Sequence, residues 1–198
     1  MNRMYSKKIE ALRSTLETLK EERGKAEQDG RKTLVQLADM AIYIILLDLD
    51  RYIFLIQFLN ERDEFVQHVH AKHLAGTLHA LFEKIRTFLG KEARELIEKL
   101  PDGENHLSEM DALGARIRPY SKQHEKSFRL IRNTITAHRD LNVDEQLKAI
   151  ASINPSEIRT VATEMETWHG DIYAFITKVL ISYTNSSLMI REVLSKSS

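Results

Sequence analysis

The stretch from residue 31 to residue 60, RKTLVQLADMAIYIILLDLDRYIFLIQFLN, decides the fold. Apolar residues occupy almost every face of a helix drawn through it, which predicts a central, buried helix. Its residues 41–59 are nearly long enough to span a bilayer. However, Asp48, Asp50 and Arg51 stand at the centre of that segment, where each would cost about 2.5 to 3.5 kcal/mol in lipid. We therefore interpret the stretch as a core helix and expect no membrane association.

The charges inside this stretch need an explanation of their own. Asp48 and Arg51 are three residues apart, so they lie on one face of a helix and can pair. Because buried charges are usually paired, we interpret them as a structural ion pair, in the bundle interior or at a dimer seam. The alternative is that they position a catalytic group.

Helical patterns flank the central stretch on both sides. Residues 4–28 carry a narrow apolar stripe at spacings of three and four, typical of a surface helix that packs on the body of the protein or pairs with another copy. A third helix is expected at about residues 63–89, with Phe65 and the later apolar residues pointing inward. A short helical piece should follow Gly90 and end before the turn that starts at Pro101.

The second half of the chain contains three further helix starts. Ser108, with acidic residues after it, is expected to cap a helix that continues to about Ala137 and bends near Pro119. Asn142 and Asn154 are each followed three residues later by Glu, which predicts a short helix and then a long last one.

These patterns together predict an all-α protein, an antiparallel helical bundle of about five to six long helices, because that arrangement buries all the apolar faces with short connections. We expect one domain over residues 1–198, with residues 1–28 as the surface or pairing helix and residues 31–194 as the bundle body.

Composition excludes several classes of function. With 29 basic and 29 acidic residues the formal net charge is zero, which argues against a protein that coats nucleic acid through a generally basic surface. The chain has no cysteine, and so no disulfide, no thiolate nucleophile and no cysteine-based zinc site. The first residues lack the pattern of a signal peptide, so we expect a cytoplasmic protein.

Histidines raise the possibility of a metal site. His70 and His73 can share a face of the third helix, and Glu166 with His169 forms a Glu-x-x-His pattern. However, the pattern occurs once, without the paired glutamates that a di-iron bundle needs. We therefore predict no metal site.

A local basic patch does stand out against the neutral total charge. Between residues 116 and 140 seven basic residues face only two acidic ones. Lys122, Lys126 and Arg129 follow at spacings of four and three, which places them on one ridge of a helix that suits a phosphate backbone. A merely solvated helix face is the alternative interpretation.

The residues that follow are Arg132-Asn133-Thr134-Ile135-Thr136-Ala137-His138-Arg139-Asp140. Arg-Asn, a short apolar run and Ala-His-Arg-Asp resemble the signature of the HEPN superfamily, Arg-x(4 to 6)-His, in its abortive-infection members. Five residues separate the Arg from the His here, and the motif follows several helices, as it does in those helical-bundle proteins.

This resemblance implies a metal-independent endoribonuclease without a cofactor, a homodimer whose two motifs face each other, and an antitoxin or companion protein as a further partner. Arg132 and His138 would be catalytic, while Asn133 and Arg139 would contact RNA together with the Lys122, Lys126 and Arg129 ridge. No DNA substrate is expected. Asp140 stands where a toxin branch of the superfamily has a Tyr that is modified, which argues against that mode of neutralisation.

Geometry sets a condition on the motif. Six positions along an ideal helix amount to about 600°, which leaves Arg132 and His138 roughly 120° apart around the axis. Either the helix ends before His138, or the two side chains meet across a dimer. Two alternatives remain open: a non-catalytic helical module that binds RNA, a nucleotide or a protein, and a purely structural bundle.

Overall fold

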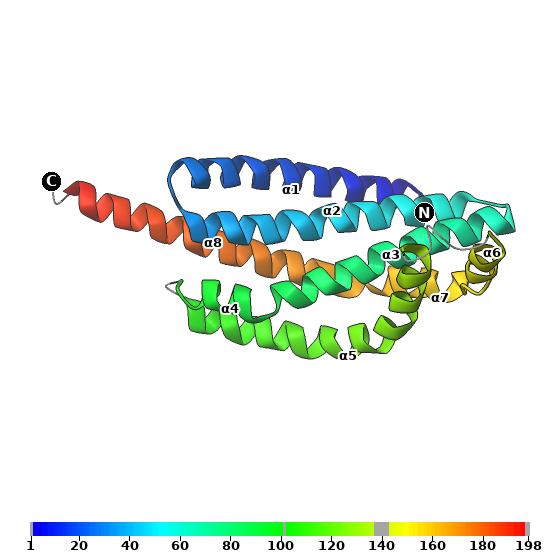
Figure 1. The fold of residues 1–198 in the computed structure, drawn as a ribbon. Coiled ribbons are helices and arrows are strands. Elements are labelled where there is room, and N and C mark those ends of the chain that lie inside the picture. Colours follow the sequence, from blue (N-terminus) through cyan, green and yellow to red (C-terminus); the bar gives the residue numbers. More distant parts are fainter. Residues whose placement is uncertain (1, 101, 137–142, 197–198) are drawn as a thin grey trace.

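The computed structural model describes residues 2–100, 102–136 and 143–196, and Figure 1 shows that these residues are almost entirely helical. No strand occurs in these three ranges, which confirms the all-α prediction. The helices are α1 (Asn2–Gln28), α2 (Lys32–Asn60), α3 (Glu64–Phe88), α4 (Lys91–Ile97), α5 (Gly103–Thr136), α6 (Val143–Ala151), α7 (Pro155–Glu164) and α8 (Glu166–Lys196).

The long helices α1, α2 and α3 form consecutive antiparallel pairs, and α8 runs between α2 and α5 (Figure 1). The α1–α2 connection turns at Gly30, whose φ of 68° lies in the left-handed region that glycine adopts without steric cost. The α2 helix is central as predicted, since its buried side chains face both α1 and α3. None of the described helices is long and apolar enough to cross a membrane.

The first helix packs on α2, inside the bundle. Tyr5 and Leu12 of α1 are buried in the main hydrophobic core, and Ala26 is buried as well. Arg23 Nε donates to Asp39 Oδ1 of α2 at 2.5 Å. Because its apolar stripe is used within the chain, α1 is a component of the bundle.

The start of α5 differs from the sequence prediction. Ser108 lies inside this helix, which begins at Gly103, so the prediction of Ser108 as the capping residue is wrong. The Asp102 carbonyl accepts the His106 N–H at 3.2 Å, and the Asp102 carboxylate accepts from the Asn105 amide at 2.6 Å. Asp102 therefore precedes the first turn of the helix, six positions before Ser108, and its carbonyl accepts one of the first helical hydrogen bonds. The helix continues through Pro119 and changes direction in its C-terminal half (Figure 1).

The last helix begins where the sequence predicts, but the structure contains two helices in place of one. Asn154 caps α7 by accepting from the N–H groups of Ser156 and Glu157 at 3.1 and 3.3 Å, with Pro155 at the first helical position. The prediction of one continuous helix is wrong, because α7 ends at Glu164 and α8 begins at Glu166.

Two other expectations concern single residues. Phe65, expected to point inward, is 54% exposed, because it lies in the first turn of α3 at the edge of the core. Asn142, expected to cap the short helix, lies outside the described residues.

Candidate functional site

The sequence-predicted site residues lie at and beyond the C-terminal end of α5. Arg132 and Asn133 belong to the backbone of this helix, as does Lys126, but their side chains are outside the described part of the structure. His138 and Arg139 lie outside the described residues altogether. The relative positions of the Arg132 and His138 side chains thus stay a prediction.

Two members of the predicted ridge are described. Lys122 and Arg129 are both exposed. They are seven positions apart, which brings them to nearly the same side of the helix. On the inner side, Phe128 is completely buried and stacks on Phe82 of α3, with ring centroids 6.0 Å apart. This packing fixes which side of α5 is presented to solvent, and that side carries the two cations.

The two earlier basic residues of the patch have intramolecular partners. Arg116 pairs with Asp171 of α8, with Nη2 and Oδ2 2.8 Å apart. Arg118 Nη2 donates to the Leu89 carbonyl at 3.2 Å and so holds α5 against the end of α3. Part of the basic composition between residues 116 and 140 therefore contributes to packing, which its spacing in the sequence did not reveal.

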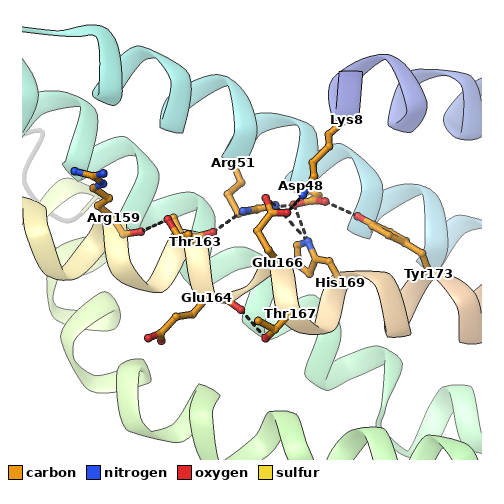
Figure 2. Close-up of polar contacts among 11 residues, drawn as sticks. Lys8, Asp48, Arg51, Arg159, Thr163, Glu164, Glu166, Thr167, His169 and Tyr173 are labelled. Carbon is orange, nitrogen blue, oxygen red and sulfur yellow. Dashed lines mark hydrogen bonds and ion pairs between the residues drawn. The ribbon is translucent and has the colours of Figure 1, made fainter. Parts of the chain in front are cut away.

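A second polar site lies inside the bundle, around the predicted Asp48–Arg51 pair (Figure 2). Arg51 Nε donates to Asp48 Oδ1 at 2.6 Å, and both side chains are fully buried, which places the pair in the bundle interior as predicted. Asp48 also accepts from His169 Nδ1 at 2.9 Å and from the Tyr173 hydroxyl at 2.8 Å. We call Lys8, Asp48, Arg51, Glu166, His169 and Tyr173 the buried polar cluster.

The remaining donors of Arg51 reach the α7–α8 junction. Its Nη1 donates to the Ala162 carbonyl at 2.5 Å, and its Nη2 lies 3.5 Å from Glu166 Oε1. In a continuous helix the Ala162 carbonyl would accept the Glu166 N–H. Here it accepts from the Arg51 guanidinium, at the point where α7 ends and α8 begins. Lys8 of α1 forms an ion pair with Glu166 and closes the cluster from its other side.

The protonation states follow from these contacts. Burial alone would raise the pKa of Asp48, but the hydrogen bonds from His169 and Arg51 and the charge of Arg51 outweigh it and hold that pKa at about 2. Burial lowers the pKa of His169, although Asp48 favours its charged form, so this imidazole is neutral and its Nδ1–H donates to Asp48. Two carboxylates then balance Arg51 and Lys8, and the cluster has no net charge.

The buried polar cluster predicts acid sensitivity. The pKa of His169 is lowered from 6.5, so below about pH 6.5 this residue is protonated in the unfolded chain but stays neutral in the folded chain. The free energy of unfolding therefore falls as the pH drops below about 6.5. Asp48, whose pKa is about 2 against 3.8, adds a loss of about 2 kcal/mol between pH 4 and pH 2. Urea unfolding at pH 7.5 and 5.5 measures the first loss.

The variant His169→Gln isolates that contribution, since its amide can still donate to Asp48 but does not titrate. The difference in unfolding free energy between the two pH values should shrink in this variant. His73, whose pKa burial also lowers, keeps its own contribution in both proteins. An equal loss in wild type and His169→Gln would show that His169 does not cause the acid sensitivity.

The buried polar cluster is suited to holding helices together rather than to catalysis. His169 and Asp48 are enclosed, so a substrate has no route to the group that could transfer a proton. Its members come from α1, α2 and α8 and fix how these helices pack. Sequence reasoning found the Asp48–Arg51 pair and noted Glu166 and His169, but it missed Lys8 and Tyr173, which carry no local signal.

Comparison with known proteins adds no relative from which a role could be transferred. The chain has no significant match among family models, curated proteins or solved structures.

Proposed function

We propose that this protein is a metal-independent endoribonuclease of defence or toxin type, acting at the end of α5. The proposal is carried by the Arg132-x5-His138 motif, which follows Lys122 and Arg129, two exposed cations of α5, in the sequence. In a chain with no net charge, this concentration of basic residues ahead of an Arg and a His supports binding of a phosphate backbone.

The proposed reaction uses the RNA's own nucleophile. The ribose 2′-oxygen attacks the adjacent phosphorus and loses its proton to a base, while the 5′-oxygen of the next nucleotide leaves and takes up a proton. The products are a 2′,3′-cyclic phosphate and a 5′-hydroxyl end. Since water and a metal ion are not needed for this step, a general acid or base and a cation are sufficient.

Each motif residue has a role that fits its chemistry. His138 accepts the proton of the 2′-hydroxyl or donates a proton to the leaving 5′-oxygen, because an imidazole titrates near neutral pH. Arg132 holds the scissile phosphate through two parallel hydrogen bonds and stabilises the charge that develops on it. Asn133 and Arg139 hold the flanking nucleotides, and Lys126 continues the ridge between Lys122 and Arg129.

The helical geometry makes a second copy part of the proposal. Arg132 and His138 would lie roughly 120° apart around the axis if α5 were extended to His138 as an ideal helix. A homodimer lets the Arg132 of one copy and the His138 of the other meet across a two-fold axis. We further propose a cytoplasmic protein with an antitoxin or other companion protein, as is usual for a ribonuclease toxin.

The test is incubation of the purified protein with pooled tRNA and messenger RNA in the presence of EDTA. We expect discrete cleavage products from the wild-type protein and none from a folded Arg132→Ala variant. RNA binding without cleavage, lost at high salt, would replace this proposal by the non-catalytic binding module. Neither binding nor cleavage would favour a structural bundle.

A further inference from the structure

A groove between α3 and α5 has an apolar floor and a polar rim whose charged side chains are all cationic. Its volume is about 260 Å³, and its floor is made of the buried side chains Phe82, Ile85, Leu89 and Ile117. The rim side chains are Arg86, Arg118, Ser121 and Lys122.

The charge on this rim is one-sided. Three of the described residues that line the groove are basic and none is acidic, although the chain as a whole contains equal numbers of each. An apolar floor beside converging cations complements a ligand with a flat apolar part and an anionic part. A nucleotide has this chemistry, since its base has an apolar face and its phosphate is negative.

The three cations differ in how they are held. Arg86 Nη2 lies 3.9 Å from Glu83 Oε1, and Arg118 Nη2 donates to the Leu89 carbonyl. The Arg118 guanidinium also lies against Gly114, close enough that an added Cβ there would come within 3.1 Å of it. Arg118 is therefore pre-positioned at the rim. Lys122 forms no ion pair with any side chain that the structure describes, and its side chain is exposed at the edge of the groove.

The position of the groove connects it to the proposed active site. Lys122 belongs both to the rim and to the exposed ridge that leads along α5 to Arg132. The two residues are ten positions apart, or about 15 Å along the helix axis before any bend. A single strand of RNA can cover this distance with a few nucleotides.

We propose that the α3–α5 groove binds one nucleotide of the RNA substrate, a few positions away from the cleaved bond. The base lies on the floor formed by Phe82, Ile85, Leu89 and Ile117, and the phosphate contacts Arg118 and Lys122. This inference rests on the proposed ribonuclease function. It adds a subsite that makes cleavage depend on single-stranded RNA extending beyond the scissile bond.

Two variants separate the rim from the floor. Lys122→Ala removes a phosphate contact, so RNA affinity should fall a few-fold to about tenfold, and the slope of log affinity against log salt should decrease in size by about 0.7. Ser121→Phe fills the groove without changing charge, so affinity should fall with the salt slope unchanged. Lys99→Ala, which removes an exposed lysine elsewhere, is the matched control and should change neither.

The measurement is the dissociation constant of a labelled single-stranded RNA decamer at several salt concentrations, with melting curves to show that each variant is folded. If Lys122→Ala and Ser121→Phe bind RNA as the wild type does while cleavage persists, the subsite is wrong and the ribonuclease proposal stands. If both variants lose affinity but the wild type never cleaves RNA, the groove binds nucleotides and the ribonuclease proposal is wrong. If Ser121→Phe fails to fold, Ser121→Leu, which fills less of the groove and also leaves the charge unchanged, takes its place; unchanged affinity in that folded variant means that the subsite is wrong.

Discussion

Replacing Arg51 by Ala is expected to lower the free energy of unfolding by about 3 to 5 kcal/mol, since removing one partner leaves a buried charge uncompensated. The variant leaves Asp48 with the neutral donors His169 and Tyr173 as its remaining described partners. It also frees the Ala162 carbonyl at the α7–α8 junction and opens a cavity. Urea unfolding followed by circular dichroism at pH 7 measures the change.

A surface ion pair provides the matched control. Arg94 donates two hydrogen bonds to Asp111, of 2.5 and 3.2 Å, and the shorter one is similar in length to the 2.6 Å bond of the buried Arg51–Asp48 pair. Both of its side chains are solvent-exposed, and Arg94→Ala should therefore cost far less than Arg51→Ala. Equal losses in the two variants would contradict the role assigned to burial.

Replacing His138 by Ala is expected to lower the rate of RNA cleavage by about 10² to 10⁴-fold, the usual contribution of a general acid or base. The variant must keep the circular dichroism spectrum and the unfolding midpoint of the wild type for the loss of rate to count as catalytic. The measurement is the single-turnover rate on a labelled RNA in EDTA.

Control variants distinguish catalysis from binding. His70→Ala removes a histidine of α3 and should leave the rate unchanged. Arg129→Ala removes a ridge cation and should raise the apparent KM more than it lowers kcat. Arg132→Lys keeps the charge but loses the bidentate fork, so kcat should fall with little change in RNA affinity. A His138→Ala variant as fast as the wild type would exclude the proposed proton transfer.

The outline of the fold could be predicted because its signals are local. The continuous apolar pattern of residues 31–60 identified α2, and Asn154 followed by Pro155 identified the start of α7. The Asp48–Arg51 pair was also predictable, because two charges three residues apart in an apolar helix have few other ways to be satisfied.

The departures from prediction depend on contacts between distant residues. The division at Met165 accompanies the hydrogen bond from Arg51 to the Ala162 carbonyl, a partner 111 positions away. Lys8 and Tyr173 join the buried polar cluster only because α1 and α8 pack on α2 at that level. The start of α5 was misplaced because Ser108, followed by acidic residues, has the local pattern of a capping residue, whereas the helix already begins at Gly103.

The composition and the motif select a candidate site in the sequence, but they do not predict the packing around it. The ridge cations Lys122 and Arg129 are exposed, as their spacing suggested. The groove beside them could not be predicted from the sequence, because its lining residues come from both α3 and α5 and meet only in the folded chain. Its floor residues Phe82 and Ile85 were recognised only as inward-facing positions of the third helix. The roles of Arg116 and Arg118 in holding α5 depend on tertiary contacts.

The most direct measurement is the chemical identity of the new RNA ends formed by the wild-type protein in EDTA, determined by mass spectrometry of the cleaved fragments. Attack by the 2′-oxygen predicts 2′,3′-cyclic phosphate and 5′-hydroxyl ends, with both lost in Arg132→Ala and His138→Ala. Ends that carry a 5′-phosphate and a 3′-hydroxyl, or cleavage that both folded variants retain, would contradict the proposed function.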